Sequence, residues 1–204
     1  MVTRKELNTK TIALIIAFAA LAIALNPAIT GMGVPFPPIT GLIYNLWEIV
    51  IIAAFLLMGF KSGISIALIN ALFLFAVFPG PSRPMYPLNN TAAILSTLTG
   101  IFIVNRLTNR GFQKENVKPG VKSVACATGL ATLFRVVVMA PLMYVNAALI
   151  NGLPTPVVLG FVLPLQAVFN VTLLLYAVPV GYLIAGVINR NLKLSRGSMN
   201  EVTP

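Results

Sequence analysis

Six long apolar stretches, separated by polar or proline- and glycine-rich segments, set the pattern of this chain. They cover residues 11–29, 41–60, 62–78, 90–107, 121–148 and 158–189. Because a helix rises about 1.5 Å per residue, about 20 apolar residues cross the hydrocarbon of a bilayer. The pattern therefore predicts an all-α, polytopic membrane protein, built as a six-helix transmembrane bundle.

Proline and glycine gather in two of the connecting segments. NPAITGMGVPFPPITG follows the first predicted helix, and PGPSRPMYP precedes the fourth. Both segments also carry large apolar side chains, so we expect ordered loops there. Within the last two predicted helices, Pro141, Pro164 and Pro179 are candidate kinks, because proline removes a backbone donor.

Composition strengthens the membrane interpretation. The chain is 58% hydrophobic and 9% charged, with a mean hydropathy of +0.93, whereas about a quarter of the residues of a soluble domain are charged. The net charge of +10 does not indicate nucleic-acid binding, because the basic residues are scattered between apolar blocks and form no basic and aromatic patch.

The basic residues instead predict the orientation in the membrane. If the six stretches are helices, one side carries twelve of the 14 lysines and arginines: Arg4, Lys5, Lys10, Lys61, Arg106, Arg110, Lys114, Lys118, Lys122, Arg190, Lys193 and Arg196. The positive-inside rule places that side, with both termini, in the cytoplasm. Arg83 falls on the outer side, and Arg135 falls inside the fifth helix. We expect the first stretch to be a helix of the bundle and not a cleaved signal peptide.

The residue types that are missing restrict the chemistry. The chain has no histidine, no aspartate, one cysteine and four glutamates. Histidine-based catalytic triads and histidine or cysteine metal sites therefore cannot form, and little acid–base chemistry is available. We expect neither enzymatic activity nor a metal or cofactor, and an intramembrane enzyme is a remote alternative.

Two ionisable residues, Glu48 and Arg135, fall inside predicted helices at comparable depths from the outer side. A charged side chain at the centre of a membrane helix costs at least about 2.5 kcal/mol, so such groups face the bundle interior or a wet cavity. Two interpretations follow. Glu48 and Arg135 either contact a ligand together or form a structural ion pair that joins the second and fifth helices.

Polar side chains share helix faces with these two residues. Arg135 and Asn146 lie on one helical stripe, together with Met139 and Leu142. The other members of the set also fall in the outer half of the predicted bundle: Asn45, Trp47, Asn90, Gln166 and Asn170. Any one of these amides could serve only to join helices. Their common depth, with apolar residues around them, predicts a small-molecule pocket.

The first helix carries a stripe of small residues, Ala13, Ala17, Ala20 and Ala24. Small residues four apart let another helix approach closely. The stripe either packs inside the bundle or docks onto a separate membrane subunit.

The whole-chain pattern resembles the substrate-binding S component of energy-coupling factor (ECF) vitamin transporters, which belong to the ABC transporters. The similarity covers about residues 10–190. It consists of the alanine-rich first helix, the proline-rich first outer loop, the GFKSGISIALIN turn, and the amide-containing last helix QAVFNVTLLLYAVPVGYLIAGVINRNL. Riboflavin-type members are the most similar.

The resemblance implies a non-enzymatic protein of the plasma membrane. Residues 1–10 and 191–204 would be cytoplasmic ends, and residues 11–190 the six-helix substrate-binding domain. A vitamin would bind among Asn90, Arg135, Asn146, Gln166 and Asn170, with Phe36 in a capping loop. A transmembrane coupling subunit would contact the alanine stripe and carry two ATPase subunits. The sequence itself has no G-x-x-x-x-G-K-[ST] loop for ATP phosphates.

The residue types in the chain restrict the range of possible substrates. The resemblance makes thiamin, cobalt and nickel unlikely substrates, because those members use histidine. A flat, uncharged ring such as that of riboflavin suits the amides with Trp47, Phe161 and Phe169, whereas a carboxylate such as biotin or pantothenate suits Arg135. The alternative function is a self-sufficient small transporter or channel with a gate formed by Glu48 and Arg135.

Overall fold

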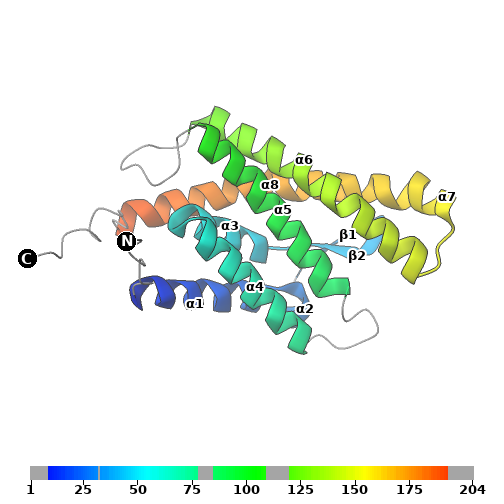
Figure 1. Cartoon of the computed structure of the whole chain (residues 1–204), viewed down its shortest axis with the longest axis horizontal. Coiled ribbons are helices and arrows are strands. Elements are labelled where there is room, and N and C mark those ends of the chain that lie inside the picture. The colour runs from blue at the N-terminus through cyan, green and yellow to red at the C-terminus, as the bar shows by residue number, and fades with distance from the viewer. Residues whose placement is uncertain (1–8, 32, 78–84, 109–119, 193–204) are drawn as a thin grey trace, which may run out of the picture.

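The computed structural model of the chain describes residues 9–31, 33–77, 85–108 and 120–192 (Figure 1). These residues are mostly helical. The elements are α1 (Thr9–Ala24), α2 (Pro27–Thr30), β1 (Val34–Phe36), β2 (Ile39–Tyr44), α3 (Trp47–Met58), α4 (Phe60–Val77), α5 (Met85–Leu107), α6 (Val121–Tyr144), η1 (Val145–Ile150), α7 (Thr155–Val157), η2 (Val158–Val162) and α8 (Leu163–Leu192).

Four of the helical segments in the described part are long and apolar enough to cross a membrane: Phe60–Val77, Met85–Leu107, Val121–Ile150 and Thr155–Arg190. Two further apolar helices are shorter, Thr11–Ala24 and Trp47–Met58. The described part therefore has four candidate membrane crossings, consistent with a helical membrane protein, and the count of six crossings stays a prediction.

A short β-hairpin interrupts the helical pattern. β1 and β2 pair antiparallel, with Val34 opposite Tyr44 and Pro35 opposite Ile43. The prediction of an all-α chain with a helix from residue 41 is therefore wrong over Gly41–Tyr44, since α3 begins only at Trp47. ITGLIY is rich in β-branched and aromatic residues, and the preceding Pro37–Pro38 turn lets it fold back on β1.

Two other helix boundaries differ from the prediction. α5 begins at Met85, five residues before the predicted start at Asn90, because Pro87 lies in the first turn, where a missing N–H breaks no helical bond. The first stretch is split at Asn26, whose Oδ1 accepts a hydrogen bond of 3.0 Å from the Ala28 amide and caps α2.

The last two helices are longer than predicted and continue through their prolines. α6 runs past Pro141 into the π-helical segment η1. The helical run Thr155–Arg190 contains η2, Pro164 and Pro179. A buried apolar contact joins the two π-helical segments, where Ala147 packs with Val158 and Val162. Single-turn π segments are frequent at functional sites, and Asn146 lies in one of them.

The core forms around α3, which is only 12 residues long but buried at every position from Trp47 to Leu56. α8 approaches it closely at Gly181, where an added Cβ would come within 2.6 Å of an Ile52 methyl group. α5 and α6 meet in the same way at Gly100, where a Cβ would lie 2.5 Å from the Ala131 Cα. Small residues thus let the helices of this bundle touch along their backbones.

The two ends of the bundle differ in character (Figure 1). On the left of the figure lie the start of α1, the α3–α4 junction, the end of α5, the start of α6 and the end of α8. We call this the terminal end. The hairpin and α7 lie toward the right of the figure; we call this the hairpin end. The exposed residues Lys61, Arg106, Lys122 and Arg190 all belong to element ends at the terminal end.

Candidate functional site

A cavity of about 320 Å³ lies toward the hairpin end, within the size range of ligand pockets. Its walls come from α2, the hairpin, the first turns of α3 and α5, the second half of α6 with η1, and the start of α8. The non-helical backbone of β2 thus lines a cavity inside the protein. This is where a membrane protein tolerates strand and loop conformations at membrane depth.

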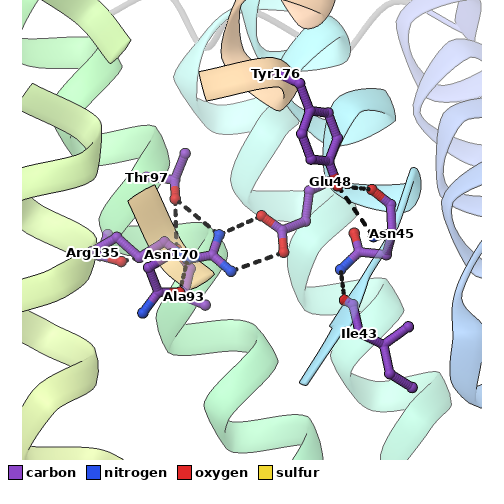
Figure 2. A network of polar contacts seen from close by, with 9 residues as sticks. Ile43, Asn45, Glu48, Ala93, Thr97, Arg135, Asn170 and Tyr176 are labelled. Atoms are coloured by element: carbon purple, nitrogen blue, oxygen red, sulfur yellow. Dashed lines mark hydrogen bonds and ion pairs between the residues drawn. The ribbon is translucent and has the colours of Figure 1, made fainter. Parts of the chain in front are cut away.

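An ion pair between Arg135 and Glu48 forms part of the cavity wall (Figure 2). The pair is bidentate: Arg135 Nη1 donates to Glu48 Oε2, and Nη2 donates to Oε1 at 3.0 Å. The two side chains are only 4% and 2% exposed. A planar guanidinium facing both carboxylate oxygens is the strongest common geometry for such a pair.

Two neutral groups complete the surroundings of the arginine (Figure 2). Arg135 Nε donates to Asn170 Oδ1 at 2.9 Å, and Nη1 also donates to Thr97 Oγ1 at 3.4 Å. The Thr97 hydroxyl donates its own proton to the Ala93 carbonyl at 2.8 Å, which leaves its oxygen lone pairs for the arginine. Glu48, Thr97, Arg135 and Asn170 therefore tie together α3, α5, α6 and α8.

Asn45 lies in the turn that connects the hairpin to α3. Its backbone carbonyl accepts a hydrogen bond of 2.9 Å from the Tyr176 hydroxyl, and its Nδ2 donates to the Ile43 carbonyl at 3.2 Å (Figure 2). The other polar atom of the Asn45 side chain is its amide oxygen, Oδ1. This oxygen is buried and has no hydrogen-bond partner among the described residues.

Aromatic rings fasten the hairpin to α8. Phe36 of β1 and Tyr44 of β2 both pack on Phe169, with ring centroids 5.7 and 5.0 Å away. The hydroxyl groups of Tyr44 and Thr172 are 2.7 Å apart and hydrogen-bonded. Aromatic pairs at these distances each contribute about 0.5–1.5 kcal/mol beyond area burial, so the hairpin is a packed cover over one side of the cavity.

The structure brings most of the predicted site residues together. Seven of the eight line the cavity: Trp47, Glu48, Asn90, Arg135, Asn146, Gln166 and Asn170. The eighth, Phe36, is buried behind the wall against Phe169. Contact with a ligand stays a prediction for all of them. Asn90 lies in the second turn of α5 and does not open the helix.

Some lining residues were missed, and one aromatic residue was misplaced. Met85, Tyr86 and Asn89 line the cavity from the first turns of α5, a segment that its prolines had marked as a loop. Asn89 follows Met85 by four positions, and Asn90 follows Tyr86 by four, so a longer helix would have placed them on one side. Phe161 was expected beside the ligand but is 53% exposed in η2, so that expectation is wrong.

The alanine stripe of α1 faces outward. Ala13, Ala17, Ala20 and Ala24 are all exposed, while the opposite side of the helix buries Ile15, Ala19 and Ala22 in the core. The stripe therefore does not pack inside the bundle, which was one of its two interpretations. Contact with a partner subunit stays a prediction.

Among the described residues, no group of three or more His, Cys, Asp or Glu side chains could hold a metal ion. A scan against protein-family models and searches of curated proteins and of solved structures find no match to this chain. The cavity, its ion pair and its cover are therefore the observations on which a function rests.

Proposed function

We propose that this protein is the substrate-binding S component of an ECF-type ABC transporter in the plasma membrane. It captures a vitamin or related micronutrient from outside the cell, and partner subunits drive uptake with ATP. The observation that carries this proposal is the covered cavity of about 320 Å³, with amides and an ion pair in its wall. The protein itself is a binding subunit and has no enzymatic activity.

The position of the cavity supports a role in capture from one side. It lies toward the hairpin end, away from the start of α1 and the end of α8 (Figure 1). The exposed basic residues of the described part gather at the terminal end, which is the cytoplasmic side by the positive-inside rule. The cavity then belongs to the outer half of the membrane.

The hairpin supports a role as the cap of the binding site. It begins in the segment between the first two long apolar stretches, where the family resemblance implies a capping loop, and ends at Tyr44, inside the second stretch. Ring contacts to Phe169 and the hydrogen bond between the Tyr44 and Thr172 hydroxyl groups hold it against α8. Such a cover can separate from α8 to admit a ligand and close over it.

The outward-facing alanine stripe of α1 supports contact with a transmembrane coupling subunit. Ala13, Ala17, Ala20 and Ala24 leave a shallow helix face that a second membrane helix can approach. We assign it to a coupling subunit that carries two ATPases, because this chain has no phosphate-binding loop of its own.

Riboflavin or a related ring system is the preferred substrate. Trp47, Tyr86 and Phe169 offer apolar ring surfaces around the cavity, and six amide side chains offer donors and acceptors: Asn45, Asn89, Asn90, Asn146, Gln166 and Asn170. This combination suits a flat heteroaromatic compound with polar edges.

Uptake by proteoliposomes tests the proposal. Liposomes that contain only this protein should bind radiolabelled riboflavin without accumulating it, and should accumulate it once the coupling subunit, both ATPases and ATP are present. If the protein is instead a self-sufficient transporter with a gate formed by Glu48 and Arg135, liposomes that contain it alone should accumulate riboflavin. Accumulation by the protein alone, abolished by Arg135→Met, would establish that alternative.

A further inference from the structure

The charged groups in the cavity wall cancel each other. Glu48 and Arg135 are the two charged side chains among the residues that line it. Glu48 meets the guanidinium with both carboxylate oxygens, and Asn170 and Thr97 accept two further hydrogen bonds from Arg135. The positive charge of Arg135 is therefore neutralised within the protein.

This pairing acts against anionic ligands. A ligand carboxylate that reached Arg135 would lie beside the Glu48 carboxylate or would displace it. Like charges side by side are strongly unfavourable in a site shielded from water. Displacement would leave Glu48, which is 2% exposed, as a buried charge without its partner. The wall thus rejects the class of ligand that a free Arg135 would attract.

The rest of the wall is uncharged. The ring surfaces of Trp47 and Phe169 and the adaptable side chains of Met139 and Met143 suit the apolar part of a ligand. Amide side chains in the same wall can donate hydrogen bonds to its polar edge and accept hydrogen bonds from it: Asn89, Asn146 and Gln166.

We infer that the cavity binds an uncharged ligand, and that Glu48 is the residue that excludes carboxylate ligands. The inference rests on the proposed function and narrows its substrate class. It separates two families of candidates that the sequence left open, neutral rings and carboxylate-bearing compounds.

Two pairs of probes that differ only in charge test the inference: 10-(carbamoylmethyl)flavin with 10-(carboxymethyl)flavin, and biotinamide with biotin. Affinities are measured by calorimetry on the full chain in detergent. The wild-type protein should bind the neutral member of at least one pair about tenfold or more tighter than its carboxylate. In Glu48→Gln, which frees Arg135, that ratio should fall by about tenfold or invert.

Matched amide variants test the uncharged wall. Asn90→Leu should weaken the neutral probe about tenfold, because it replaces a polar side chain of the cavity wall. Asn70→Leu should leave the affinity unchanged, because Asn70 is a buried amide outside the cavity wall. Equal effects of the two variants would show that the Asn90 amide acts only through the fold.

The inference is overturned if wild-type protein prefers the carboxylates, binds both members of each pair equally, or binds none of the four probes. The ratio of the two affinities in the wild-type protein tests the inference even if Glu48→Gln does not fold.

Mass spectrometry of the small molecule released from purified protein distinguishes failure of the inference from failure of the proposed function. A released carboxylate contradicts the ligand class and leaves the binding function intact, whereas absence of any ligand, with no ATP-driven uptake, contradicts the proposed function itself.

Discussion

Arg135 joins four helices of the bundle. It lies on α6 and bonds to Glu48 on α3, Thr97 on α5 and Asn170 on α8. A positive charge in an apolar helix predicts a negatively charged partner, and the chain has only four glutamates and no aspartate to supply one. Thr97 could not be predicted, because a helical threonine usually satisfies its hydroxyl on its own backbone. Here the Thr97 hydroxyl does that as well, toward Ala93.

Arg135→Met should destabilise the protein by about 3–5 kcal/mol, because it leaves Glu48 buried without its partner. Thermal or denaturant unfolding in detergent micelles measures the change. The double variant Arg135→Met/Glu48→Met removes both charges and should recover most of the lost stability. If the double variant is no more stable than the single one, the ion pair is not the source of the loss.

Asn170 and Asn146 should separate structure from binding. Asn170→Leu removes the acceptor of Arg135 Nε, so stability and ligand binding should both fall, stability by about 1–3 kcal/mol. Asn146 makes only a long side-chain contact of 3.5 Å with Asn151, so Asn146→Leu should weaken binding while the unfolding temperature stays within a few degrees. Unchanged affinity in Asn146→Leu would remove this residue from the site.

At the scale of single elements, the hairpin was the main feature that the sequence did not reveal. ITGLIY runs without a charged residue into the helix that follows it, and a short apolar run fits a buried helix or a strand equally well. The strand is decided by contacts distant in sequence, Tyr44 with Thr172 and Phe36 with Phe169. The long helices were predictable because their apolar runs far exceed strand length.

Phe36→Ala should loosen the hairpin without unfolding the bundle. It removes ring contacts to Tyr44 and Phe169, and truncation of a buried phenylalanine costs about 3–5 kcal/mol. Hydrogen exchange should accelerate for amides of β1 and β2, and ligand should dissociate faster. Exchange in α3, with its buried core position Ile52, is the internal control. Faster exchange in α3 to the same degree would mean that the hairpin is not a separate cover.

At the scale of the whole molecule, the bundle has one basic end and one end with the covered cavity. Its outer surface is largely apolar, including exposed leucine, valine and phenylalanine side chains on α4, α6 and α8. That surface suits lipid and also suits a membrane partner. The alanine stripe is the part of it where a second helix can come closest.

Ala17→Leu should weaken assembly with the coupling subunit at least about tenfold, because the added side chain fills a close helix contact. Co-purification from detergent measures assembly, and calorimetry should show unchanged ligand affinity. Ala125→Leu is the matched control, since Ala125 is an exposed alanine on α6, away from the stripe. Equal assembly of both variants would exclude the stripe as the docking surface.

Native mass spectrometry of the intact protein, released from detergent micelles, tests the central claim most directly. The account predicts one small organic molecule per chain, uncharged after release, and its loss in Asn90→Leu but not in Asn70→Leu. A chain that carries no small molecule and takes up none from a mixture of water-soluble vitamins would contradict the account.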